Sequence, residues 1–175
     1  MAWLDWFRTA GRAAVILALV VVLAACATMG PPLVMTASFD PEAASFIHAK
    51  GRAKVSGQAF VRLNSGKLLR AVGTDITLIP RTPYADERMA AIYGDDKQAG
   101  RAVNIPDADP RYVQSTRTTV ASSGGSFSFD DVADGEYYVV AMIHIPSDYI
   151  TVERPIYERV TVKGGESVRI VMRGY

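Results

Sequence analysis

Residues 124–140 read GGSFSFDDVADGEYYVV, and this stretch predicts two strands joined by a turn. Phe127 and Phe129 alternate with serines, which is the period of a strand with one buried face. The run EYYVVAMIHI, which begins at residue 136, is apolar on both faces, with Tyr137 and Tyr138 on opposite sides. A strand that is apolar on both faces is expected to be covered on both, so we predict that this run is a central strand.

The three acids between these runs, Asp130, Asp131 and Asp134, raise the question of a metal or catalytic site. Their spacing does not fit a calcium loop of the EF-hand kind. Catalysis by paired carboxylates would need an acid that burial keeps protonated, whereas Asp134 followed by Gly135 has the composition of an exposed turn. We interpret the acids as part of a turn, with a weak cation site and catalysis as the alternatives.

The residues on either side continue the pattern of strands and turns. In AKVSGQAFVRL, residues 53–63, the odd-numbered positions are small or apolar and the even-numbered ones are polar, with Phe60 as the exception. Ile76 and Leu78 alternate with polar residues before a proline. Residues 157–173, YERVTVKGGESVRIVMR, place two alternating runs around a Gly-Gly pair and predict a hairpin. Several short strands at such intervals indicate an all-β sandwich of two packed sheets.

Residues 82–94 have a different pattern, that of one short helix inserted between strands. Thr82 suits the N-cap, Pro83 suits the first helical position, and Gly94 supplies a stop. A long polar loop is predicted over residues 95–112, and loops of that length in compact domains are commonly functional. We therefore expect a partner-binding surface, if the chain has one, at this insertion, with these candidate residues: Tyr84, Tyr93 and Tyr112.

Taken together, these elements resemble the carboxypeptidase regulatory-like or transthyretin-like (prealbumin-like) β-sandwich family. The resemblance covers residues 51–175 and is carried by GQAFVRL, ITLIPRTPY and GSFSFDDVADGEYYVVA. The family has a glycine in its first strand, here Gly57, then a strand that ends in proline, here Pro80. A Phe-x-Phe and Gly-x-Tyr element follows, here residues 127–137. The resemblance implies a transthyretin-like (Ig-like) fold and no particular activity.

The N-terminus has the layout of a secretory signal peptide. Arg8 and Arg12 precede an apolar run, residues 13–25, that ends at Cys26. A run of about 13 residues is too short to span a bilayer as a helix, which needs about 20. The sequence Leu23-Ala24-Ala25-Cys26 resembles the lipobox of bacterial lipoproteins, which implies cleavage before Cys26 and lipidation of its sulfur. A plain signal anchor with an incidental cysteine is the alternative.

Lipidation would divide the chain into a signal peptide (1–25), a lipidated cysteine with its tether (26–44) and a β-sandwich domain (45–175). The membrane would be a partner only through the lipid on Cys26. Ala27, where an aspartate would imply retention at the inner membrane, resembles the sorting signal for the periplasmic face of the outer membrane. Because Cys26 is the only cysteine, lipidation would leave no thiol for disulfides, metal binding or nucleophilic catalysis.

Composition argues against several classes of function. A chain of 175 residues with a net charge of +1 and no basic tract offers little to a nucleic acid. The two histidines are too few for a zinc site. We interpret His144 as a satisfied or edge histidine and not as a ligand, and His48 as a residue without neighbouring ligands. The sequence contains no nucleophile elbow, phosphate loop or His-Glu-x-x-His motif. We therefore expect no catalytic residue, no metal ion and no cofactor.

These observations favour a lipid-anchored envelope protein that serves, without catalysis, as a structural or protein-interaction module for an unidentified envelope protein. Two alternatives remain open. One is a carbohydrate- or peptidoglycan-binding module, whose partner would be a cell-wall glycan. The other is an accessory lipoprotein of a secretion system, since the type VI secretion outer-membrane lipoproteins have a similar anchor and fold class.

Overall fold

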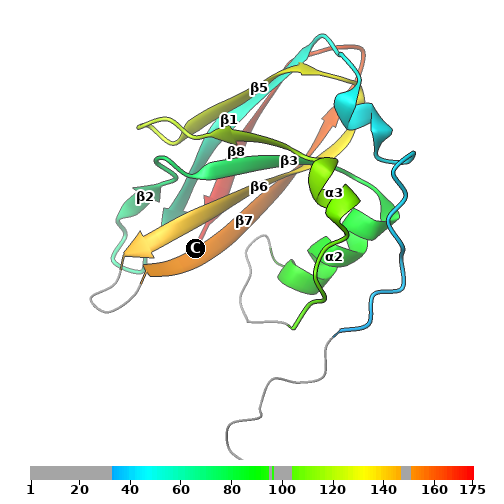
Figure 1. The fold of residues 1–175 in the computed structure, drawn as a ribbon. Coiled ribbons are helices and arrows are strands. Elements are labelled where there is room, and N and C mark those ends of the chain that lie inside the picture. The colour runs from blue at the N-terminus through cyan, green and yellow to red at the C-terminus, as the bar shows by residue number, and fades with distance from the viewer. Residues whose placement is uncertain (1–32, 95, 97–103, 147–150) are drawn as a thin grey trace, which may run out of the picture. The chain divides into compact units, whose positions relative to one another are not determined.

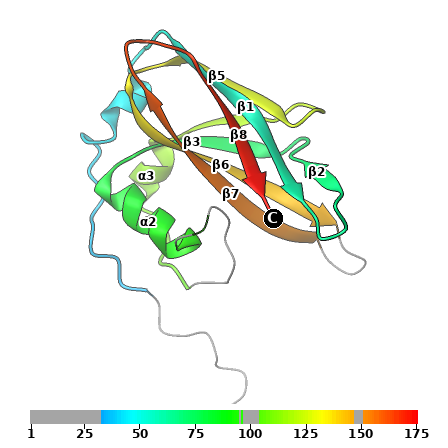
Figure 2. The ribbon, with the colours of Figure 1, turned by 180° about the vertical axis from the view of Figure 1, so that it is seen from behind.

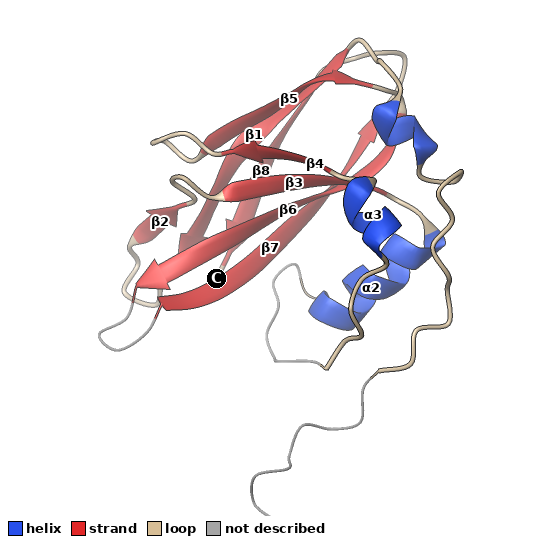
Figure 3. Ribbon diagram, in the orientation of Figure 1, coloured by secondary structure: helices blue, strands red, loops and turns tan. Residues whose placement is uncertain are grey.

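Two four-stranded β-sheets pack face to face and enclose the main core (Figure 1). The computed structural model describes residues 33–94, 96, 104–146 and 151–175. The strands are β1 (Ala53–Arg62), β2 (Leu68–Arg70), β3 (Asp75–Pro80), β4 (Arg117–Val120), β5 (Ser126–Val132), β6 (Gly135–Pro146), β7 (Thr151–Val162) and β8 (Val168–Gly174). The helices, blue in Figure 3, are the 3-10 helix η1 (Ser45–His48), α2 (Pro83–Tyr93) and α3 (Pro110–Gln114). The predicted all-β sandwich is confirmed.

The first sheet, sheet A, is built around β1, which pairs antiparallel with β5 and β2 and parallel with β8. The second, sheet B, has the order β4-β3-β6-β7 with antiparallel neighbours throughout. The central position predicted for the run at residues 136–145 is confirmed, because β6 lies between β3 and β7. Its two apolar faces meet two different layers, the core between the sheets and the helices.

The core between the sheets follows the alternation seen in the sequence. Buried and exposed positions alternate along β1, and the odd-numbered residues from Ala53 to Val61 point inward. Phe127 and Phe129 on β5 face the same core and are 5% and 3% exposed. Ile76 and Leu78 enter it from sheet B, where both are fully buried. These inward faces agree with the predicted ones, since residues two apart on a strand share a face.

The hairpin predicted for residues 157–173 is wrong, because its two strands belong to different sheets. β7 pairs with β6 in sheet B, whereas β8 pairs in parallel with β1 in sheet A. The chain crosses between the sheets at Gly164 and Gly165, whose φ angles of 63° and 74° favour glycine. Two alternating apolar runs look the same whether their apolar faces line one sheet or meet across the core, so the pattern could not distinguish the two arrangements.

The helices form a third layer on the outer face of sheet B (Figure 2). Thr82 caps α2 as predicted, since its side-chain oxygen accepts a hydrogen bond of 3.2 Å from the backbone N–H of Ala85. The helix ends at Gly94, which has a φ of 59°. A second short helix, α3, lies where the sequence predicted only a polar loop, and the carboxylate of Asp109 caps it by accepting from the backbone N–H of Arg111.

The segment before residue 45, predicted to be part of a tether, contributes to this layer from residue 36 onward. Phe39 is 6% exposed and its ring lies 5.6 Å from that of Tyr84. The compact unit therefore begins N-terminal to the predicted boundary at residue 45 and spans Pro32–Tyr175. The predicted signal peptide, residues 1–25, and Cys26 lie outside the described residues. Among the residues that are described, none of the helices is long and apolar enough to cross a bilayer.

The Gly-x-Tyr element between β5 and β6 has a clear packing role. A Cβ atom on Gly135 would lie 2.6 Å from the ring of Phe46, so only glycine allows that ring to approach. Two residues later, the hydroxyl of Tyr137 donates a 2.8 Å hydrogen bond to the carbonyl of Ala133. Burial raises the pKa of Tyr137 to about 12, so this hydroxyl keeps its proton at physiological pH. The element fixes the turn that follows β5.

Candidate functional site

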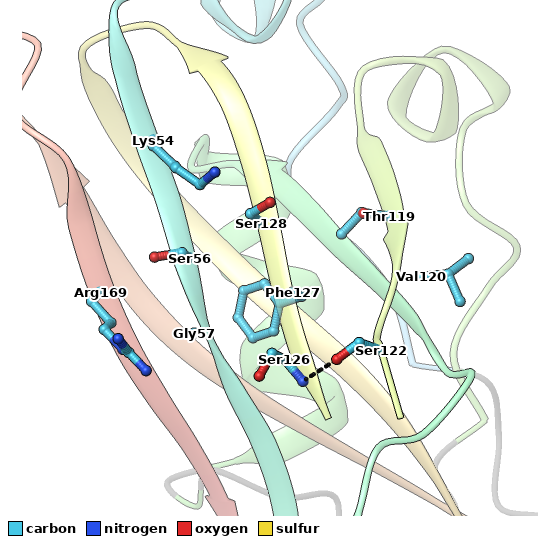
Figure 4. A pocket seen from close by; sticks show the side chains of 10 residues that line it. All are labelled: Lys54, Ser56, Gly57, Thr119, Val120, Ser122, Ser126, Phe127, Ser128 and Arg169. Atoms are coloured by element: carbon cyan, nitrogen blue, oxygen red, sulfur yellow. Dashed lines mark hydrogen bonds between the residues drawn. The ribbon is translucent and has the colours of Figure 1, made fainter. Parts of the chain in front are cut away.

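A surface groove with a volume of about 380 Å³ lies on the outer face of sheet A and reaches the edge strand β4 (Figure 4). Two cationic side chains, Lys54 and Arg169, line it from β1 and β8. Hydroxyl groups line it from β1, β4 and β5, and they belong to Ser56, Thr119, Ser126 and Ser128. In Figure 2 the strands β1 and β8 are seen without a helix in front of them, in contrast to the outer face of sheet B.

The pleat of the strands places these side chains outside. On β5 the phenylalanines point into the core, so the serines that alternate with them point outward. The strand register then sets Ser56 between Ser128 on one side and Arg169 on the other. Neighbouring strands are about 4.8 Å apart, so a row of three such residues spans about 10 Å. One ligand can therefore reach hydroxyl groups and a guanidinium at once.

Hydrogen bonds and positive charge are what this groove offers to a ligand. The hydroxyl of Ser126 accepts a 3.3 Å hydrogen bond from the side-chain amide of Gln58, and that of Ser122 accepts from the backbone N–H of Ser126. A nucleophilic serine needs a general base within hydrogen-bond reach, and neither of these partners is a base. Lys54 forms an exposed ion pair of 3.1 Å with Asp130. The arrangement suits binding of a polar ligand.

The three tyrosines predicted to bind a partner are core residues in the structure. Tyr84, Tyr93 and Tyr112 are 7%, 6% and 9% exposed, respectively. The rings of Tyr84 and Tyr112 lie 5.1 Å apart, and the ring of Tyr93 lies 4.5 Å from that of Tyr157 on β7. Burial raises the pKa of Tyr112 to about 12 and raises that of Tyr93 further. These rings attach the helices to sheet B and do not form an exposed platform, because the helices turn their aromatic side toward the sheet.

A polar network also ties α2 to sheet B. The hydroxyl of Tyr138 on β6 donates a 2.6 Å hydrogen bond to Asp86, and the guanidinium of Arg81 lies 3.0 Å from the same carboxylate. Arg81 also pairs with Glu136 at 2.8 Å. The carboxylate of Asp86 raises the pKa of the Arg81 guanidinium, which is charged at all physiological pH values. The network positions the first turn of α2 and presents no group to the groove.

The three acids of the opening motif lie around the turn between β5 and β6 and the bulge that precedes it. The carboxylate of Asp134 accepts hydrogen bonds of 2.6 and 2.8 Å from the backbone N–H groups of Gly164 and Gly165. Asp131 has a φ of 54°, the left-handed region, and lies where the register of β1 and β5 shifts. Across the described residues, no group of three or more His, Cys, Asp or Glu side chains is placed to hold a metal ion.

The two histidines lie apart from the groove. His144, interpreted from the sequence as a satisfied or edge histidine, lies near the end of β6 and faces Glu153 at 3.5 Å, with both side chains more than half exposed. His48 ends η1 and is exposed. The two imidazoles lie on different elements.

The segment at residues 36–37 is held to α2 by a single carboxylate. Glu87 accepts hydrogen bonds of 2.7 and 2.6 Å from the backbone N–H groups of Thr36 and Ala37, and one of 2.9 Å from the hydroxyl of Thr36. These bonds lower the pKa of Glu87, first through the backbone of Thr36 and then through that of Ala37. We call residues 36–44, which lead from this carboxylate to η1, the strap.

Protonation of Glu87 is expected to loosen the start of the strap. A carboxylate whose pKa is lowered by folding stabilises the folded form at neutral pH, and the contribution is lost as the pH falls through the lowered pKa. Amide NMR shifts of Thr36 and Ala37 should therefore change in acid, and Glu87→Gln should produce a similar change at pH 7. Glu42→Gln, a control with the same loss of charge within the strap, should leave both shifts in place. Shifts that respond neither to acid nor to Glu87→Gln would contradict this role.

The groove residues were not singled out from the sequence, although part of the signal was present. The alternation predicted that Ser56 and the serines beside Phe127 and Phe129 lie on the solvent side of their strands. Which strands are neighbours was not predictable, and the parallel pairing of β8 with β1 brings Arg169 beside Ser56. A binding site built across strands depends on that pairing.

Comparison with solved structures identifies a similar fold. A Pseudomonas aeruginosa protein that has been proposed to bind carbohydrate superposes with a TM-score of 0.65 at 23% identity, over 78% of this chain and 98% of that one. A shaft pilin of Lactobacillus rhamnosus GG has 14% identity and a TM-score of 0.30, over 70% of this chain and 47% of the pilin. Chlorocatechol 1,2-dioxygenase of Pseudomonas putida has 13% identity and a TM-score of 0.29, over 82% of this chain and 66% of the enzyme.

No protein-family model matches the chain, and no curated protein sequence does. The two more distant structures are too dissimilar to carry an argument. At 23% identity, the first of the three shows a shared β-sandwich fold.

Proposed function

We propose that this chain is a lipid-anchored protein of the cell envelope whose transthyretin-like β-sandwich binds carbohydrate without catalysing a reaction. The observation that carries the proposal is the open groove on the outer face of sheet A, with its hydroxyl lining. Sugars are recognised through hydrogen bonds to their hydroxyl groups, and a serine hydroxyl both donates and accepts. A groove that opens to solvent on the face of a sheet can accommodate part of a longer sugar chain.

Two further points support this reading. The structural neighbour from Pseudomonas aeruginosa, which has been proposed to bind carbohydrate, has the same fold over nearly its whole length. A lipid on Cys26 at the periplasmic face of the outer membrane would hold the sandwich beside cell-wall and surface glycans, so that even weak sites would be occupied at high local concentration. The lipid, its location and the non-catalytic character are parts of the proposal.

A protein-interaction module, including an accessory lipoprotein of a secretion system, is the second candidate. The tyrosines predicted as candidate partner-binding residues are buried, but a different feature supports this second candidate. Val113 on α3 and Val120 on β4 are 58% and 61% exposed. Both lie on or beside the edge strand of sheet B, and exposed apolar side chains at a sheet edge are a surface that a protein partner can bury. This surface adjoins the groove at Val120.

Binding to glycans by the full-length lipidated protein, purified in detergent, tests the proposal. We expect the protein to sediment with isolated peptidoglycan sacculi or to bind immobilised polysaccharides. The double variant Ser56→Val/Ser128→Val removes two groove hydroxyls and keeps side chains that strands favour. Each lost hydrogen bond contributes about 1 kcal/mol, so this variant should bind at least about tenfold more weakly. Thr161→Val removes a hydroxyl group on the exposed side of β7, far from the groove residues in sequence, and should bind like the wild type.

The outcomes separate the two candidates. Binding that the Ser56→Val/Ser128→Val change leaves intact would place the glycan site elsewhere and remove the argument from the groove. Absence of binding to sacculi and to every polysaccharide, together with cross-linking of an envelope protein that Val120→Asp abolishes, would replace the proposal with the protein-interaction module.

A further inference from the structure

We infer that the groove belongs to a longer site on the outer face of sheet A that binds an acidic polysaccharide, a glycan whose sugars carry carboxylate or phosphate groups. This inference rests on the proposed function, which it deepens by naming the class of glycan. The feature that supports it is the distribution of charge. Removal of residues 1–25 would take two of the 19 basic and one of the 18 acidic residues, so the mature chain would have a net charge of zero. The charges on sheet A are far from balanced.

The charged side chains on the outer face of sheet A are mainly cationic. We call the five of them that carry positive charge the basic face, and they are Lys54 and Arg62 on β1, Arg70 on β2, and Arg169 and Arg173 on β8. Two acids, Asp130 and Asp131, lie at the end of β5. The surplus is therefore three positive charges on one sheet face of a chain whose mature form would have no net charge.

The arginines of the basic face are available to a ligand. Lys54 is paired with Asp130, but within the described ranges no salt bridge joins any of the four arginines to a carboxylate. A guanidinium presents five N–H donors in a planar fork that matches carboxylate and phosphate groups. Such a group binds an anion through charge-assisted hydrogen bonds, which are stronger than bonds between neutral groups.

The register of the strands arranges the face as a track. At one end, Arg169 on β8 lies beside Ser56 on β1, and Lys54 precedes Ser56 by two residues on β1. The next row, Ser126, Gln58 and Val171, carries a hydroxyl and an amide. Then Phe60, which is half-buried, lies between Arg70 and Arg173 in the strand register. From Lys54 to Arg62 the strand extends about 26 Å, at about 3.3 Å for each residue.

This order of groups fits a polymer with repeated negative charge. Cationic groups occur at both ends of the track, and hydrogen-bonding groups occupy the middle. The ring of Phe60, the exception in the sequence pattern of β1, offers an apolar surface on which the apolar face of a sugar ring can lie. A single small anion would contact only one end of the track, whereas a chain of acidic sugars would contact the whole.

An anionic lipid surface is the other ligand that positive charge could attract, and the face is less suited to it. A surface that binds a bilayer inserts bulky apolar side chains into the headgroup region. The exposed large apolar residues of sheet A on this face are Leu68 and Val171, at 41% and 43% exposure, and Val120, at 61%, adjoins the groove on the edge strand β4 of sheet B. The groove is a hollow lined by short hydroxyl side chains, which a flat bilayer surface would not fill.

The test compares two polymers that differ only in charge. Polygalacturonate and its carboxyl-reduced, neutral derivative are immobilised, and binding of the full-length protein in detergent is measured. We expect the acidic polymer to bind at least about tenfold more tightly, and its binding to weaken as salt rises from about 0.1 M to about 1 M, because the Debye length falls from about 10 Å to about 3 Å. The double variant Lys54→Gln/Arg169→Gln should lose about tenfold or more for the acidic polymer and little for the neutral one.

The matched control removes the same charge elsewhere. Arg159→Gln/Lys163→Gln changes two exposed cations on β7 and in the turn that follows, and it should keep the affinity for polygalacturonate within about twofold of the wild type if the basic face is the site. Thermal unfolding of both double variants verifies that the fold is intact. Detergent micelles that contain phosphatidylglycerol are added as a competitor, and they should displace the acidic polymer no better than micelles without it.

Three outcomes would overturn the inference, and they differ in whether the proposed glycan-binding function remains. Equal binding of both polymers, unaffected by Lys54→Gln/Arg169→Gln, would retain a glycan-binding function without the basic face. Displacement by phosphatidylglycerol would identify the face as a lipid-binding surface. Absence of binding to either polymer and to sacculi would remove the proposed function together with the inference.

Discussion

Cys26→Ser is expected to abolish lipidation completely. In the proposed lipoprotein the lipid would be attached to the sulfur of this cysteine as a thioether, and a serine hydroxyl is a much weaker nucleophile than a thiolate at neutral pH. Cys26 is the only cysteine of the chain, so no other thiol can replace it. Each methylene of an attached chain contributes about 0.8 kcal/mol to membrane binding, and loss of the lipid removes all of it. The variant should remain a precursor that retains residues 1–25.

Metabolic labelling with a palmitate analogue measures this directly. The wild-type protein should incorporate the label and show a mature N-terminus at residue 26, whereas Cys26→Ser should incorporate none. Ala27→Ser, a change of similar size at the next position, serves as the control and should be labelled like the wild type. Continued labelling of Cys26→Ser would rule out the lipid anchor and, with it, the proposed location of the protein.

The second large effect is expected at Gly57, in the middle of β1. A Cβ atom at this position would lie 2.4 Å from the carbonyl oxygen of Ile170 and 2.8 Å from Cζ of Phe127. The first of these atoms belongs to the backbone of β8, the parallel neighbour, which cannot move away without disturbing its pairing with β1. Gly57→Ala should therefore destabilise the fold by about 3 kcal/mol, the upper part of the range for overpacked cores.

Thermal and urea unfolding of the purified variants measure the effect. A loss of about 3 kcal/mol corresponds to a fall in Tm of roughly 10 °C for a domain of this size. Ser56→Ala changes the adjacent residue, whose side chain points outward and is half-buried, and it should shift the Tm by no more than about 2 °C. If Gly57→Ala melted as close to the wild type as Ser56→Ala, β1 and β8 could not be as close as the structure places them.

Short sequence patterns predicted the strands and the helix cap of this fold well, because the formation of these elements depends on residues that are close together in the chain. The alternation of Phe127 and Phe129 with serines, and the N-cap at Thr82, are decided by backbone geometry and adjacent side chains. The two apolar faces of β6 predicted its central position for the same reason, since each face must be covered by some other layer.

The partners of each element were less predictable because they depend on contacts between distant residues. The tyrosines Tyr84, Tyr93 and Tyr112 lie in a region that looked like a functional insertion, yet the outer face of sheet B needs an apolar cover and these rings supply it. The start of the strap looked like tether, and the carboxylate of Glu87, some fifty residues later in the chain, holds it to α2. Neither the burial of these tyrosines nor the contact between the strap and α2 can be recognised from residues that are close together in the sequence.

What the sequence determined by itself is therefore the longer strands, the faces that they bury, and the turn at Asp134 and Gly135. Each depends on spacing along the chain or on a short motif. The lipidation of Cys26 stays a prediction from a short motif. Only the tertiary structure decided that Gly164 and Gly165 carry the chain from one sheet to the other, because alternating runs can meet in either way. That crossing places β8 beside β1, and with it the arginines beside the serines. The candidate site exists only through this pairing.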